Sequence, residues 1–296
     1  MTDNHPPSPP PSLPLSPAAA VLLNTALTAL FFGSFYLCPQ PHAGASRDHP
    51  RVVRTRFAAV GLSCAAGAAV VRTALTRSGQ SDWSLAQALG LHTTGLLTGT
   101  LLPLLLTASL FTGPLVVEFL SWRRWPPSTT LGERAASAVR DILFWRNYVV
   151  APVTEEFVFR GCMLALFRAA GISDVKAVFT LPLFFGLAHL HHGYAAYKTL
   201  GGGRHAFIRV AASAAFQLAY TTLFGWFATF LLLRTGHLAA PIASHMFCNV
   251  MGFPDLDAVE QHPRHRALVI ASYIAGMCIF GLALFPATSP WLYSQV

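Results

Sequence analysis

Long apolar runs separated by short polar connections make up most of this chain. Eight runs can be distinguished, and several approach or exceed the roughly 20 residues that a helix needs to cross a bilayer. They cover residues 18–37, 57–75, 87–120, 147–168, 174–191, 207–233, 237–253 and 267–286. The third run is long enough to tilt or to extend past the membrane, and the seventh is short enough to be a partial or re-entrant helix. The pattern predicts an all-α, multi-pass integral membrane protein with about eight transmembrane helices.

Composition supports this fold class and separates the N-terminal segment from the rest. Hydrophobic residues make up 53% of the chain and charged residues only 11%, whereas soluble domains carry about 25% charged residues. Residues 1–17 contain seven prolines and no Lys or Arg, so we expect a disordered tail rather than a cleavable signal peptide. Residues 18–296 are then expected to form a single membrane domain.

The distribution of Lys and Arg predicts the orientation of that domain. Connections one, three, five and seven carry 14 of the 20 basic residues, and connections two, four and six carry five. The positive-inside rule places the basic connections in the cytosol and both termini on the opposite side. The net charge of +8 therefore indicates contact with the lipid bilayer rather than with nucleic acid. In the third connection, residues 131–147 have an apolar face typical of a helix lying on the membrane surface.

Three charged residues interrupt the fourth apolar run. Glu155, Glu156 and Arg160 lie within six residues of each other, although one ionised group at the centre of a membrane helix costs about 2.5–3.5 kcal/mol on insertion scales. Glu156 and Arg160 are four residues apart, so they can form an ion pair on one helix face. Glu155 points away from this pair and has no partner at helical spacing. It is either a buried, hydrogen-bonded acid or a carboxylate suited to accept a proton from water.

Further polar residues occur at the same predicted depth. His189 lies at the end of the fifth run, and His245 and Asn249 lie one helical turn apart in the seventh run. Taken singly, His189 could be interfacial, and the other two could form a hydrogen bond between helices. Together with Glu155 they all fall toward the predicted cytosolic side. A carboxylate, two imidazoles and an amide at one point indicate an intramembrane catalytic cavity for hydrolysis. A role for Ser244 or Cys248 as nucleophile is disfavoured.

These residues also form three ordered motifs. Residues 155–160, EEFVFR, fit EExxxR; residues 185–189 fit FxxxH; and residues 245–249 fit HxxxN. In order and approximate spacing, the chain resembles the type II CaaX prenyl endopeptidases, the Ras-converting enzymes. The sequence AHLHH at residues 188–192 resembles the eukaryotic branch of that family. The motif-bearing core covers residues 147–252.

The resemblance implies an activity and residue roles. Members of this family sit in the endoplasmic reticulum membrane and remove the last three residues from proteins ending in a prenylated Cys-a-a-X box. Farnesylated or geranylgeranylated CaaX proteins of the small-GTPase type are the implied partners. Glu155 and His189 would activate the attacking water, and His245 and Asn249 would stabilise the oxyanion. Glu156 and Arg160 would support Glu155.

A zinc ion and other functions remain alternatives at this point. Glu155, His189 and His245 are a plausible set of zinc ligands, and His192 could take the place of one of them. The chain has no HExxH motif, however. We favour water activated directly by Glu155 and His189, with no cofactor. The five cysteines are scattered singly and indicate packing. A zinc-dependent intramembrane protease with other substrates, or a non-catalytic scaffold or transporter, would be the competing functions.

Overall fold

The computed structural model describes residues 15–38, 46–79, 84–124, 127–188, 197–255 and 257–293. The predicted disorder of the Pro-rich tail concerns residues that lie almost entirely outside these ranges. Within them the protein is built from helices and turns, with no strand. The longer helices are α1 (Pro17–Leu37), α2 (Pro50–Arg77), α4 (Leu96–Leu110), α5 (Thr112–Arg124), α6 (Leu131–Arg140), α10 (Asp174–Ala188), α12 (Gly203–Thr235), α13 (Ala239–Met251) and α15 (Arg266–Ala287). The shorter ones are α3 (Leu85–Ala88), α7 (Ile142–Trp145), α8 (Ala151–Glu156), α9 (Met163–Ala169) and α14 (Ala258–Gln261).

Several of these helices are long and apolar enough to cross a bilayer. In the described ranges these are α1, α2, α12 and the C-terminal helical segment Pro263–Ala287. Helices α4 and α5, counted together as one bent span, would be a fifth. The two helices meet at an angle of 73°. The predicted multi-pass helical fold is therefore confirmed, while the predicted number of eight spans is not.

The bend between α4 and α5 corrects the prediction of one continuous segment over residues 87–120. Pro114 lies in the first turn of α5, where proline is well tolerated, and it has no N–H to donate to the carbonyl of Leu110, which favours a break at this point. Gly113 faces the ring of Tyr273 on α15, and a Cβ atom on Gly113 would lie 2.4 Å from that ring. The break thus lets α15 pack against both α4 and α5.

The predicted surface helix over residues 131–147 is also divided. α6 begins with a capping box in which Thr130 and Glu133 bond each other's backbone N–H groups. It ends at Arg140, and the side chain of the next residue, Asp141, accepts a hydrogen bond from the N–H of Leu143 and so starts α7. None of the α6 side chains is buried.

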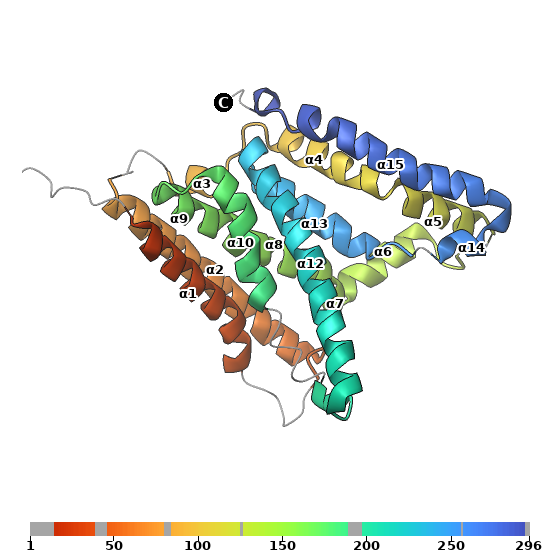
Figure 1. Cartoon of the computed structure of the whole chain (residues 1–296), viewed down its shortest axis with the longest axis horizontal. Coiled ribbons are helices and arrows are strands. Elements are labelled where there is room, and N and C mark those ends of the chain that lie inside the picture. Colours follow the sequence, from red (N-terminus) through yellow and green to blue (C-terminus); the bar gives the residue numbers. More distant parts are fainter. Residues whose placement is uncertain are drawn as a thin grey trace, which may run out of the picture.

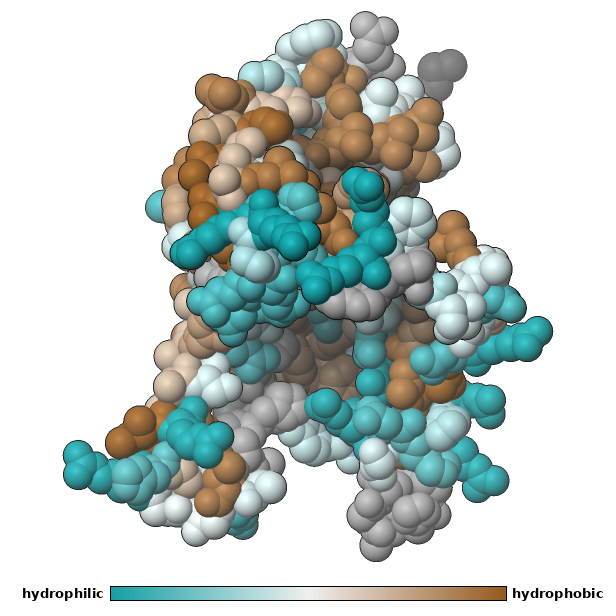
Figure 2. Space-filling model, turned by 90° about the vertical axis from the view of Figure 1, so that its right-hand side faces the viewer, coloured by the Kyte–Doolittle hydropathy of each residue, from teal (hydrophilic) through white to brown (hydrophobic). Residues whose placement is uncertain are grey.

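The helices spread from one end of the molecule into two groups (Figure 1). In this view α1 and α2 form one group, and α4, α5 and α15 form the other. α12 and α13 run between them, with α12 packed on α10 and α13 packed on α4. Seen from the side of α14, the molecule is hollowed, with hydrophilic side chains at the rim and hydrophobic ones deeper (Figure 2).

The most deeply buried element carries the first motif. A π-helical stretch, Phe157–Cys162, joins α8 to α9 without leaving the helical path. Every residue from Val158 to Phe167 is buried, as expected of a helix that other helices surround on all sides. The ring of Phe159 packs edge-on against Phe31 of α1 and Phe185 of α10. The motif residues are therefore held by the centre of the bundle rather than by loops.

Candidate active site

The acidic pair lies at the C-terminal end of α8, between two widened helical turns. Before α8, residues Arg146–Val150 are π-helical, and the N–H of Ala151 bonds the carbonyl of Arg146. Pro152, which has no N–H, follows directly. The second π-helical stretch begins immediately after Glu156. Single π-helical turns inside α-helices are frequent at functional sites, and they shift side chains out of regular α-helical register.

Glu156 is the centre of a buried charge network. One of its oxygens, Oε1, accepts a hydrogen bond from Nη1 of Arg160 at 3.0 Å, so the ion pair expected from the spacing is present. The same oxygen lies 2.7 Å from Nδ1 of His245 on α13. Glu156 is fully buried and Arg160 is 1% exposed. Because a carboxylate oxygen paired with arginine can only accept, Nδ1 of His245 must donate its proton to Glu156.

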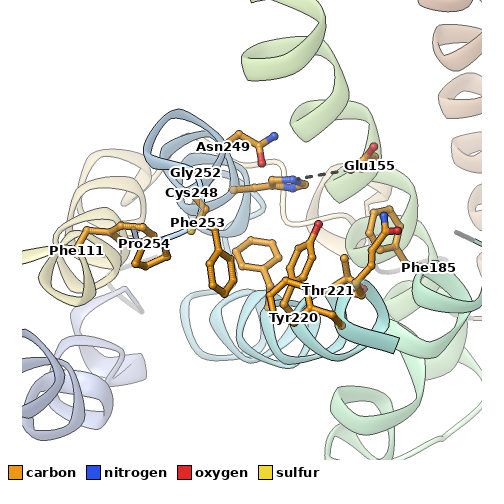
Figure 3. A pocket seen from close by; sticks show the side chains of 14 residues that line it. Phe111, Glu155, Phe185, Tyr220, Thr221, Cys248, Asn249, Gly252, Phe253 and Pro254 are labelled. Atoms are coloured by element: carbon orange, nitrogen blue, oxygen red, sulfur yellow. Dashed lines mark hydrogen bonds and ion pairs between the residues drawn. The ribbon is translucent and has the colours of Figure 1, made fainter. Parts of the chain in front are cut away.

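This contact gives Glu156 a second partner, beyond the Arg160 pair that the sequence predicted. Glu156 fixes the ring of His245, so that Nε2 of the ring faces Glu155. Nε2 and Oε2 of Glu155 are 3.9 Å apart (dashed line in Figure 3). This is too long for a direct hydrogen bond, but it is a separation that one bridging water can span. The side chains of Glu155 and His245 are 20% and 13% exposed, so both can be reached from the cavity.

Asn249 lies one turn after His245 and lines the same cavity (Figure 3). Its Nδ2 group donates one hydrogen bond to the carbonyl of Asn147 at 2.9 Å. The second N–H of this amide has no hydrogen-bond partner in the described part of the chain. The structure thus contains the bond between helical segments that was the alternative for Asn249, and it also leaves one donor available.

His189 lies outside the described residues, as does His192. Phe185, the first residue of the FxxxH motif, is described, and its ring lines the cavity beside Glu155. Among the described residues, no three His, Cys, Asp or Glu side chains are grouped closely enough to hold a metal ion. Glu155 and His245 face one another but supply only two ligands, and the third candidate is His189. The predicted choice between zinc and direct water activation therefore stays untested.

The cavity has a volume of about 650 Å³, and six of its fourteen lining residues are Phe or Tyr. Glu155, His245 and Asn249 occupy one side of it. Its other lining residues include Phe111, Phe185, Phe216, Tyr220, Phe224 and Phe253. A few polar groups set into a largely apolar wall are typical of sites that bind and orient an organic ligand.

α12 contributes residues that the sequence analysis did not single out. Phe224 packs on His245, with ring centroids 5.0 Å apart, and its ring lies 6.0 Å from the guanidinium carbon of Arg160. Gly225 lets α12 approach this network, because a Cβ atom there would lie 2.5 Å from Pro182 and 3.1 Å from Nη2 of Arg160. The sequence contains one signal for these α12 residues. Phe216, Tyr220 and Phe224 are spaced four residues apart, so they share one face of the helix.

Comparison with known proteins assigns the chain to a family. Residues 139–251, which include all three motifs, match the family described as "Type II CAAX prenyl endopeptidase Rce1-like". The human protein named CAAX prenyl protease 2 is 38% identical over 278 residues, which cover 91% of this chain and 81% of the human protein. The chain belongs to the type II CaaX prenyl endopeptidase family.

Proteins of the same name from other organisms are also similar to this chain. CAAX prenyl protease 2 of Arabidopsis thaliana is 37% identical over 70% of this chain and 68% of its own length. The probable CAAX prenyl protease 2 of Schizosaccharomyces pombe is 29% identical over 88% of this chain and 90% of its own length. No solved structure matches this chain. As a member of the family, the protein is a membrane protease that hydrolyses peptide bonds, which removes the scaffold and transporter alternatives.

Proposed function

We propose that this protease removes the C-terminal tripeptide from prenylated CaaX proteins, with Glu155 and His189 activating the attacking water. The observation that carries the proposal is the position of Glu155. Its carboxylate faces the cavity, is partly exposed, and makes no ion pair with a described residue as close as the one between Glu156 and Arg160. In this reaction the water oxygen attacks the peptide carbonyl while its proton passes to the Glu155 carboxylate. The protonated Glu155 then returns that proton to the departing amine.

His245 and Asn249 are proposed to stabilise the oxyanion of the tetrahedral intermediate. Asn249 has one free N–H for this role. His245 can donate from Nε2 only when both ring nitrogens carry protons, since Nδ1 already donates to Glu156. The charges then balance, because the carboxylates of Glu155 and Glu156 offset the positive charges of Arg160 and His245. Such compensation is what allows several charged groups to be held inside an apolar bundle.

The shape of the cavity supports a lipid-modified substrate. The aromatic wall opposite Glu155 offers apolar contact for a farnesyl or geranylgeranyl chain, and the charged side offers the reactive groups. We infer that small-GTPase-type proteins with this modification are the partners, and that the enzyme works in the endoplasmic reticulum membrane. A zinc-dependent mechanism is kept as the alternative because His189, together with Glu155 and His245, could complete a ligand set.

The direct test uses purified protein and a farnesylated peptide ending in a CaaX box. We expect release of the tripeptide, measured by mass spectrometry, both with and without a metal chelator. The same peptide without its prenyl group is the control and is expected to be cut much more slowly. Activity that is lost with chelator and restored by zinc would replace direct water activation by the zinc mechanism. Absence of cleavage for every prenylated peptide would contradict the proposed substrate.

Asn249→Ala is expected to lower kcat and to leave KM within a few-fold. Loss of one oxyanion donor typically costs on the order of 10²–10³ in turnover, or roughly 3–4 kcal/mol. The measurement is kcat per folded enzyme, together with the thermal unfolding temperature, because the bond from Asn249 to Asn147 is lost as well. If turnover per folded molecule is unchanged and only stability falls, Asn249 is a structural residue.

We also propose that the cavity opens toward the cytosol, with both termini on the other side. Single cysteines at Ser128 and His205, in a background without other cysteines, are expected to react with an impermeant thiol reagent added from the cytosolic side. His205 is exposed, whereas the nearby Gly202 has a φ of +72° that would strain a cysteine. A cysteine at Ser173, in the fourth connection, is the control and should react only after permeabilisation. The reverse labelling pattern would overturn the orientation.

A further inference from the structure

A second cavity, of about 680 Å³, lies at the opposite end of α12 from its connection to α10. It forms where the C-terminal ends of α9 and α12 meet α3 and the segment that follows α15. These elements gather at the upper end of the bundle in Figure 1. None of the residues that line it belongs to the three motifs, so the proposed reaction does not use this cavity.

The polar part of this cavity is basic. Arg168 and Arg234 line it, and none of the described lining residues is an aspartate or glutamate. By the distribution of charge along the sequence, these are two of only five basic residues on this side of the protein. Two of them line one cavity, and because Arg168 is paired with Asp174, Arg234 carries the positive charge that no described carboxylate pairs with.

The two arginines differ in how far their donors are already used. Arg168 donates from Nε and Nη2 to the carboxylate of Asp174, at 3.2 and 3.3 Å. Arg234 donates only from Nε, to the carbonyl of Thr288 at 3.1 Å. Both Nη groups of Arg234 have no hydrogen-bond partner in the part of the chain that the structure describes. Arg234 is thus half-buried, and its guanidinium is held by the Nε bond alone. The two Nη groups are the donors that can bind a pair of phosphate oxygens.

The remaining wall of the cavity is apolar and lies beside the Nη groups of Arg234. Leu164 and Leu232 are buried, and Leu233 is half-buried; all three line the cavity. α12 is one of the helices long and apolar enough to cross the membrane, and Arg234 lies in its last turn. A basic group at the end of a membrane helix, next to apolar side chains, is positioned at the depth of lipid headgroups.

We propose that this cavity binds an anionic phospholipid. Its phosphate would bind the two Nη groups of Arg234, and the part of an acyl chain nearest the headgroup would pack against Leu164, Leu232 and Leu233. A phosphate group accounts for the unused paired donors, and an acyl chain accounts for the apolar wall, which free phosphate would leave uncovered. A net negative headgroup fits better than a zwitterionic one, because the described lining offers no carboxylate to pair with a choline or ethanolamine cation. The bound lipid would connect α3, α9, α12 and the C-terminal segment.

The test measures lipid retention by the purified full-length protein. The protein is incubated in mixed micelles with phosphatidylglycerol or with phosphatidylcholine, and bound lipid is detected by native mass spectrometry. Thermal unfolding is followed in parallel. We expect phosphatidylglycerol to be retained and to raise the unfolding temperature, and phosphatidylcholine to do neither. Inorganic phosphate is expected to give no comparable increase.

Variants assign the binding to the cavity. Arg234→Gln should reduce retention of phosphatidylglycerol by about tenfold or more, since a charge-assisted pair of hydrogen bonds is lost. Arg72→Gln removes an exposed arginine on the same side of the protein and should leave retention unchanged. Gln87→Glu adds a carboxylate to the cavity wall while keeping the capping box of α3. It should also abolish retention, and it serves if Arg234→Gln does not fold.

Three results would each overturn the proposal. One is equal retention of the anionic and the zwitterionic lipid. Another is wild-type retention in both Arg234→Gln and Gln87→Glu. The third is stabilisation by inorganic phosphate that equals the effect of the lipid. Peptide cleavage by folded Arg234→Gln should stay within a few-fold of wild type, so failure of the lipid site would be distinguishable from failure of the proposed protease mechanism.

Discussion

Glu155→Gln is expected to lower tripeptide release per folded molecule by about 10²–10⁴-fold, the range that a positioned general base contributes. Glutamine has nearly the shape of glutamate and can still accept a hydrogen bond, but it cannot take a proton from water. The charge network of Glu156, Arg160 and His245 does not include the carboxylate of Glu155 at hydrogen-bond distance. Folding should therefore be affected much less than turnover.

The measurement is the single-turnover rate on a farnesylated peptide, normalised to the folded fraction from thermal unfolding. Glu118→Gln makes the same chemical change on an exposed residue of α5 and should leave the rate unchanged. Near-normal turnover by folded Glu155→Gln would remove Glu155 from the catalytic role.

His189 requires a functional test because it lies outside the described residues. We expect His189→Ala to lower the rate by a similar factor if it activates the same water as Glu155. The double variant, Glu155→Gln with His189→Ala, should then be little slower than either single variant, because residues that act as one unit have strongly non-additive effects. Effects that multiply would indicate that the two residues serve separate steps.

Spacing along the sequence predicted the contacts that lie within one helix. The ion pair between Glu156 and Arg160 follows from residues four apart on a helix, and the structure contains it. The same argument placed His245 and Asn249 on one face of α13, and both line the cavity. The all-helical membrane fold followed from long apolar runs, which need no knowledge of how helices pack.

Contacts between helices could not be obtained in this way. Helical spacing indicated the pair with Arg160, but not that the same oxygen of Glu156 also bonds His245, which is 89 residues away. The role of α12 was missed for the same reason. Its aromatic residues lie within an ordinary apolar run, and only the packing of α12 on α10 and α13 places Phe224 against His245. The break at Phe111 had a local signal in Pro114, but hydropathy alone runs through it.

Glu156→Ala is expected to lower both stability and turnover. Removing one partner of a buried ion pair typically costs about 3–5 kcal/mol, because the other charge stays buried without compensation. Arg160 is only 1% exposed, so its charge cannot turn toward water. At the same time His245 loses the acceptor that holds Nδ1 and directs Nε2 toward Glu155. The unfolding free energy and kcat per folded molecule are the two quantities to measure, and unchanged stability would contradict the paired arrangement.

A second variant separates these two roles of Glu156. Glu156→Leu combined with Arg160→Met replaces the ion pair by apolar side chains of similar size, a change that is often neutral or stabilising for buried pairs. We expect this double variant to recover most of the stability lost in Glu156→Ala. Turnover should stay low, because leucine cannot accept the hydrogen bond from His245 and the ring is no longer fixed. If the double variant recovers turnover together with stability, Glu156 serves only to neutralise Arg160, and the orientation of His245 must depend on other contacts, such as the packing of Phe224 on its ring.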